Sequence, residues 1–142
     1  MIAAPSAVWP VDKALATAFS ANAAVIARLA SSQPVHNGQA APNSDFPYIV
    51  LGTSAEDPFR LFKRAGMSGS TQFQVWTLGP DKRAAQEIYS LAKQVLDSQQ
   101  LALEDGLLML RGSCRLIAVL PGDNTARTYR AIAVYEWVTV LA

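Results

Sequence analysis

Two long strand-like segments, Leu107 to Leu120 and Thr128 to Leu141, constrain the fold of this chain more than any other feature. Between them lies Pro121-Gly122-Asp123-Asn124, a cluster of residues typical of turns. Consecutive strands joined by a short connection usually pair antiparallel. We therefore predict a long β-hairpin closed by a loop of several residues, around which the other elements must be arranged.

Two further strands are predicted upstream of this hairpin. Phe46 to Thr53 is rich in β-branched and aromatic residues, and its proline stands near the start, where a strand tolerates it. Ser70 to Leu78 alternates apolar and polar residues in the manner of a half-buried strand. The segment between them, Glu56 to Gly69, contains charges, a proline and glycines, so we expect a long irregular connection.

Two amphipathic helices complete the set of elements. Larger apolar residues recur at near-helical spacing from Val11 to Leu29, and the Ser31 to Pro34 segment ends that pattern. A second helix follows the Gly79-Pro80-Asp81 turn and runs to Asp97, with its apolar side chains on one face. The stretch Val35 to Asp45 is predicted to be a loop.

The predicted order is therefore α-β-β-α-β-β. The expected fold class is α+β, with a single mixed or antiparallel sheet and two helices packed on one face, because this arrangement buries every apolar stripe. Residues 1 to 142 fit one domain, and we expect residues 1 to 10 to form a flexible N-terminal extension.

The composition favours self-association. Apolar residues make up 51% of the chain and charged residues 16%, so a small core leaves apolar area at the surface. Large exposed apolar patches usually mark contacts with other proteins. We therefore expect an oligomer.

Charge and cysteine content exclude several other classes. The formal net charge of +1 gives no overall field that would attract a polyanion such as DNA. One cysteine and one histidine cannot form an internal disulfide or a Cys/His zinc site. With no secretion signal and no apolar run of about 20 residues, we expect a soluble protein made and used inside a cell, with no cofactor and no membrane contact.

Residues that could carry catalysis each have a simpler interpretation. His36 lies in a polar predicted loop and is expected to be solvated rather than a general base. Cys114 lies in an apolar strand, where a buried thiol is expected rather than a nucleophile. Glu104-Asp105 is interpreted as a turn, and Gly66 to Ser70 as a flexible hinge that lacks the lysine of a phosphate-binding loop. We predict no catalytic or metal site.

The densest basic cluster lies within the expected irregular connection and alternates with apolar residues. Together with its apolar neighbours, the cluster comprises Phe59, Arg60, Leu61, Phe62, Lys63 and Arg64. The cluster could be a solvated loop, a contact for an acidic protein surface, or a contact for the phosphates of DNA. Because exposed aromatic and leucine side chains are costly in water, we take these six residues as the candidate protein interface, ordered when a partner docks. Trp76 and Trp137 are expected in the core.

Several local strings resemble one protein family. They are Phe46-Pro47-Tyr48-Ile49-Val50, Gln72-Phe73-Gln74-Val75-Trp76-Thr77, the helix containing Ala84-Ala85 and Ile88, and the closing Tyr135-Glu136-Trp137. Together with the order of elements, these strings resemble the tail-completion, or tail-terminator, family of long-tailed bacteriophages over roughly residues 8 to 142. The alanine-rich segment before Val11 and the length of the Val35 to Asp45 loop depart from the simplest members of that family.

The resemblance implies a non-catalytic virion protein of the phage tail, assembled in the cytoplasm of the host bacterium. It implies a homo-oligomeric ring, commonly a hexamer, that caps the tail tube and presents a surface to the head-tail connector protein. Its expected partners are further copies of itself, the tail tube protein and the connector, with DNA only as cargo passing through the ring. The alternatives are another head-tail connector or minor tail subunit, a host scaffold protein, or a small enzyme using His36 or Cys114.

Overall fold

The computed structural model describes residues 5–30, 34–40, 45–61, 64–98, 100–122 and 127–141, without the side chains of residues 59–61 and 98. Its elements, in chain order, are α1 (Val8–Ala21), α2 (Ala23–Ile26), β1 (Val35–Asn37), β2 (Tyr48–Leu61), β3 (Arg64–Leu78), α3 (Arg83–Ser98), β4 (Leu107–Pro121) and β5 (Thr128–Leu141). No described helix is long and apolar enough to cross a membrane.

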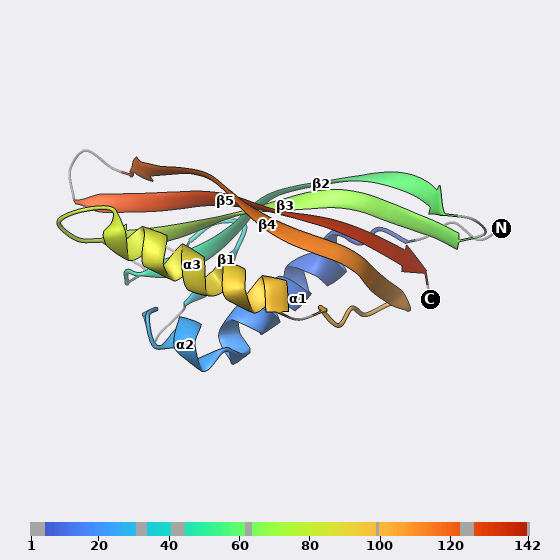
Figure 1. Cartoon of the computed structure of the whole chain (residues 1–142), viewed down its shortest axis with the longest axis horizontal. Coiled ribbons are helices and arrows are strands. Elements are labelled where there is room, and N and C mark those ends of the chain that lie inside the picture. Colours follow the sequence, from blue (N-terminus) through green and yellow to red (C-terminus); the bar gives the residue numbers. More distant parts are fainter. Residues whose placement is uncertain are drawn as a thin grey trace.

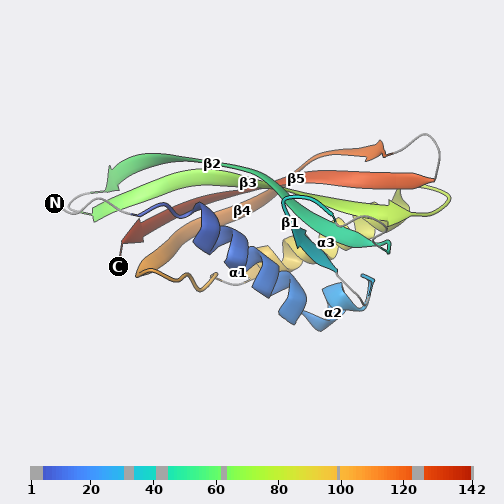
Figure 2. The same ribbon diagram turned by 180° about the vertical axis from the view of Figure 1, so that it is seen from behind.

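The strands form one mixed sheet in the order β1-β2-β3-β5-β4. β1 pairs parallel with β2, and every other pairing is antiparallel. Helices α1, α2 and α3 all lie on one side of the sheet (Figures 1 and 2). The predicted single mixed sheet with helices is confirmed, whereas the order of elements and the packing of the helices differ from the prediction by a short strand, β1, and a short helix, α2.

The expected irregular connection between the first two strands is wrong. β2 and β3 continue as an antiparallel hairpin, in which Pro58 pairs with Met67 and Leu61 pairs with Arg64. β1 covers β2 only as far as Leu51, so among the described residues β2 is an edge strand beyond that point, and edge strands are where prolines are tolerated. The predicted hinge at Gly66 to Ser70 is likewise part of β3.

Gly69 shows why glycine stands within this strand. A Cβ atom there would lie 2.4 Å from the Ala55 carbonyl oxygen and 2.6 Å from Cζ2 of Trp137. The missing side chain makes room for the Trp137 ring, which is buried as predicted. The glycine therefore serves the packing of an extended strand rather than a bend.

The N-terminal helical region also differs from the prediction. Asn22 has extended backbone angles (φ −89°, ψ 116°), and its side chain accepts a hydrogen bond of 3.1 Å from the Val25 amide, so it ends α1 and caps α2. Within the segment expected to be a flexible extension, Ala7 is fully buried and α1 begins at Val8. The Glu56 carboxylate accepts a hydrogen bond from the Ala7 amide and so ties the start of α1 to β2.

Part of the predicted Val35 to Asp45 loop is the strand β1, and residues 41–44 lie outside the described part of the chain. His36 is consequently buried rather than solvated, with its ring packed edge-on against Tyr48 at 5.3 Å between centroids. Pairing with β2 draws the polar-looking segment into the sheet, which local composition does not reveal.

The core lies between the helices and the inner face of the sheet. Its largest fully buried side chains include Phe19, Phe73, Ile88, Tyr135 and Trp137. A packed layer of this kind supplies most of the hydrophobic stabilisation of a small domain.

One carboxylate lies within this core. Asp12 of α1 accepts hydrogen bonds of 3.2 Å from Ser54 Oγ and from Thr71 Oγ1. Trp137 Nε1 donates to the same Thr71 oxygen at 3.3 Å. Burial raises the pKa of Asp12, and the two hydroxyl donors act in the opposite direction. This network joins α1 to three strands.

Candidate protein interfaces

The edge strand β4 carries most of the exposed large apolar side chains. Seven such side chains are more than a third exposed among the described residues, and five of them lie on β4. The five are Leu108, Leu110, Leu116, Ile117 and Leu120. An exposed, long and apolar edge strand is a site for association with another chain.

Two irregularities in the pairing with β5 help to explain this exposure. The register shifts between Met109 and Arg111 and again between Leu116 and Ala118, so Leu110 and Ile117 have no paired residue on β5. They are 43% and 49% exposed. A β-bulge turns an extra side chain away from the regular alternation, and bulges at sheet edges commonly serve this purpose.

The first half of the β4 edge is partly covered by the chain itself. Ala102 forms an isolated bridge with Leu108, the Gln100 side chain donates to the Met109 carbonyl, and Lys93 Nζ donates to the Cys114 carbonyl at 3.2 Å. In the described part of the chain no segment pairs with the free side of residues 115–121. We call residues 115–121 the open edge of β4.

The sequence-predicted interface lies elsewhere, at the end of the β2–β3 hairpin. Phe59, Arg60 and Leu61 belong to β2, and Arg64 is exposed at the start of β3. Phe62 and Lys63 lie outside the described residues. This end of the sheet also holds the last residues of β5, and it lies opposite the end where β4 finishes (Figures 1 and 2). The structure thus separates the open edge from the sequence-predicted interface.

A shallow polar hollow of about 640 Å³ lies on the outer face of the sheet, the face opposite the helices. Its charged lining residues include Arg111, Arg115 and Glu136. The last two form an exposed ion pair at 3.0 Å. Mixed charge of this kind gives no net attraction for a polyanion.

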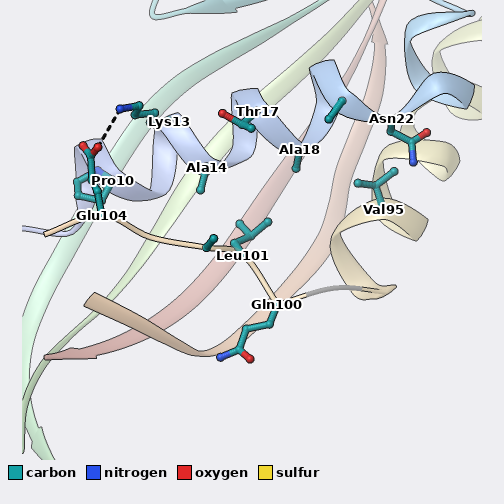
Figure 3. Close-up of a pocket in the computed structure, with 12 residues that line it drawn as sticks. Pro10, Lys13, Ala14, Thr17, Ala18, Asn22, Val95, Gln100, Leu101 and Glu104 are labelled. Carbon is teal, nitrogen blue, oxygen red and sulfur yellow. Dashed lines mark hydrogen bonds and ion pairs between the residues drawn. The ribbon is translucent and has the colours of Figure 1, made fainter. Parts of the chain in front are cut away.

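A second hollow, of about 390 Å³, lies between α1 and the segment that follows α3. Small side chains such as Ala14, Thr17 and Ala18 line it, with Leu101 opposite (Figure 3). An ion pair of 2.8 Å between Lys13 and Glu104 stands at one end. Apolar side chains make up most of the rest of the lining.

The side chains that could carry catalysis are poorly placed for it. Cys114 is buried as predicted, and burial raises the pKa of its thiol to about 11, which keeps it protonated at neutral pH. Its sulfur lies 3.9 Å from the Tyr89 hydroxyl. His36 Nε2 has no hydrogen-bond partner within the described residues. Across those same residues, no group of three His, Cys, Asp or Glu side chains could hold a metal ion.

Two features of the candidate interfaces were missed by sequence reasoning. The open edge was predicted as a strand but not as an interface, although its run of apolar residues without alternation indicates that both faces make contacts. Trp76 was expected in the core, but it is only partly buried and lies on the outer face, beside Arg130.

The turn predicted at Glu104-Asp105 is confirmed, with positive φ at Asp105 and Gly106.

Comparison with known proteins gives a family and two similar structures. The model of a family described as tail completion protein gp17 matches residues 13–140. No curated protein matches the chain. A chain in the virion of a native gene transfer agent particle is 18% identical, with a TM-score of 0.69 and coverage of 93% of this chain and 96% of that one. The gp17 protein of bacteriophage SPP1 is 19% identical, with a TM-score of 0.57 and coverage of 91% and 88%.

Proposed function

The chain belongs to the tail completion protein gp17 family, and on that premise we propose that it forms a ring that terminates a phage tail tube and joins the tail to the head. It is a structural protein of the phage tail. The observation that carries the proposal is the family match, which extends over nearly the whole domain. The proposed partners are further copies of the chain, the tail tube protein and the head-tail connector protein.

The test uses purified protein and tail tubes assembled without it. Negative-stain images should show rings in the protein alone, and they should show the protein bound only at tube ends. Tubes assembled in its presence should stop growing once capped. Binding along the tube wall, or tubes of unchanged length and unchanged ability to join heads, would contradict the proposal.

We propose the open edge of β4 as a surface through which copies of the chain associate. Leu116, Ile117 and Leu120 give it an apolar surface, and the free side of the strand offers unpaired backbone groups. A ring needs a heterologous contact, in which this edge meets a different surface of the neighbouring copy. A hexamer remains the expected ring size, following the resemblance to the family.

We propose the end of the β2–β3 hairpin as a docking surface for the tail tube. Arg64 is exposed there, and the sequence places Arg60 and Lys63 beside it. Replacing all three with Glu should weaken tube binding and leave ring formation intact, because rim charges mainly control association rate and orientation. Glu substitutions at Lys82 and Arg83, two exposed cations at the start of α3, are the matched control. Equal tube binding by the triple variant and by the control double variant would contradict the assignment of the hairpin end to tube docking.

We propose that the chain has no catalytic role and is assembled in the host cytoplasm. The buried, protonated Cys114 thiol supports the first part. The single cysteine fits a reducing compartment and supports the second part.

A further inference from the structure

A stripe of side chains, aromatic on β2 and β3, crosses the outer face of the sheet and ends at the open edge of β4. The register places Tyr48 opposite Trp76, Trp76 opposite Arg130, and Arg130 opposite Leu120. The Tyr48 and Trp76 rings stack at 6.4 Å between centroids, and Phe46 lies 5.0 Å from Tyr48. The stripe therefore joins β2, β3, β5 and the edge of β4.

Arg130 differs in its environment from the other arginines whose side chains the structure describes. Its guanidinium carbon lies 5.4 Å from the centre of the Trp76 ring, and its Nε atom is buried without a hydrogen-bond partner in the described residues. The other arginines whose side chains the structure describes either form an ion pair, as Arg28, Arg83 and Arg115 do, or are exposed, as Arg64, Arg111 and Arg127 are. Arg130 alone among them is partly buried without a carboxylate.

The Trp76 ring that supports this guanidinium is held from two sides. Its Nε1 donates to Gln74 Oε1 at 3.1 Å. The backbone at Gly122 packs so closely that a Cβ there would lie 2.7 Å from the Trp76 ring. A fixed aromatic platform pre-organises the cation, so less conformational entropy is lost when a ligand binds.

The contact with Trp76 does not fully stabilise the Arg130 guanidinium, because burial removes part of its hydration. A partly buried guanidinium loses hydration, and a cation–π contact restores only part of that loss. A carboxylate is the group that best restores it, because it matches the planar fork of the guanidinium. With Nε turned into the protein, the two terminal nitrogens remain for an end-on, bidentate contact.

We propose that Arg130, supported by Trp76, binds an aspartate or glutamate side chain of another virion protein that docks on the outer face of the sheet. The inference rests on the proposed function, since the partner belongs to the same tail assembly. Charge complementarity identifies the ligand, and continuity with Leu120 places the contact beside the open edge of β4.

The surroundings favour an acidic protein segment over nucleic acid. The same face carries the acidic residues Asp57 and Glu136, and the chain has a formal net charge of only +1. Nucleic-acid backbones are bound by several cations in concert. A single supported arginine among aromatic and aliphatic neighbours fits one carboxylate instead.

The experiment joins purified heads to tails assembled with variant proteins and counts joined particles. Arg130→Gln and Arg130→Glu should form rings as the wild type does yet join heads at least tenfold less, with Arg130→Lys intermediate because it keeps the charge but loses the fork. Arg111→Glu, an exposed cation on the same face, is the matched control and should join normally. Thermal melts establish that each variant is folded. If Arg130→Glu does not fold, the head joining of Arg130→Gln tests the proposal.

Suppressor selection then identifies the partner. Phage carrying Arg130→Glu should regain joining through a change of Asp or Glu to Lys or Arg in another virion protein. Normal joining by Arg130→Gln would overturn the inference, and so would equal losses from Arg111→Glu, which would indicate a polyanion sensing the charge of the whole face. Suppressors confined to this chain would overturn it too. Failure of the wild-type protein to form rings or join heads would instead refute the proposed function.

Discussion

Replacing Ile117 with Lys should impair ring assembly while leaving the monomer folded. The residue is unpaired in the β4 bulge and 49% exposed, so a lysine there can extend into water without displacing core atoms. In a ring, by contrast, the ammonium group would meet the surface of the neighbouring copy and lose hydration.

The magnitude follows from the exposed half of the side chain. Full burial of an isoleucine stabilises by about 1.5–3 kcal/mol, so covering the remaining half contributes about 1 kcal/mol. Desolvating the lysine raises the loss to about 2 kcal/mol per interface, the level of an interface hot spot. Each subunit contributes one such interface, so the concentration needed for assembly should rise by about 30-fold.

Light scattering over a concentration series measures this shift, and circular dichroism establishes that the variant is folded. Leu78→Lys is the matched control, because Leu78 is 56% exposed but lies on β3, away from the β4 edge. Assembly of the Ile117 variant at the wild-type concentration would refute the assignment of the edge. An equal shift for the Leu78 variant would show that surface charge alone causes the effect.

Three further predictions test the domain itself. Because the pKa of Asp12 is raised above its ordinary value of 3.8, the free energy of unfolding should fall as pH rises through that raised pKa, and Asp12→Asn, compared by denaturant titration, should lack this component. Gly69→Ala should destabilise by about 1–3 kcal/mol, because its Cβ would overlap Trp137, and a melting temperature equal to the wild type would contradict that packing. Cys114→Ser should leave head joining intact in a folded protein, and an alkylation assay should find the wild-type thiol unreactive at neutral pH, since the pKa of about 11 keeps it protonated.

Much of the fold could be predicted because the signals are local. The period of α3 and the alternation of β3 from Ser70 to Leu78 are set by neighbouring residues, and these segments are helix and strand as the sequence predicts. The prediction of secondary structure failed at residues that are common in loops but can also occupy special positions in strands. Pro58 and Gly69 indicate a loop by composition, yet an edge position and a neighbouring tryptophan make both suitable for strands.

The candidate interfaces were harder to predict, because they depend on contacts between distant segments of the chain. The six residues from Phe59 to Arg64 were found from composition, and their role remains a proposal. The open edge and the Arg130 site depend on which strands become neighbours, and segments far apart in the chain decide that. Trp76 and Arg130 are 54 positions apart in the sequence yet directly opposite in the sheet.

By itself, the sequence determined that this chain forms an α+β domain with a buried thiol, surplus apolar surface and the strings of a tail completion protein. These properties follow from composition and short-range periodicity, which act before any tertiary contact forms. Only the tertiary structure decided that β4 occupies the edge, that its bulges turn Leu110 and Ile117 outward, and that His36 is buried. Strand order and register result from packing all elements at once, so no single segment encodes them.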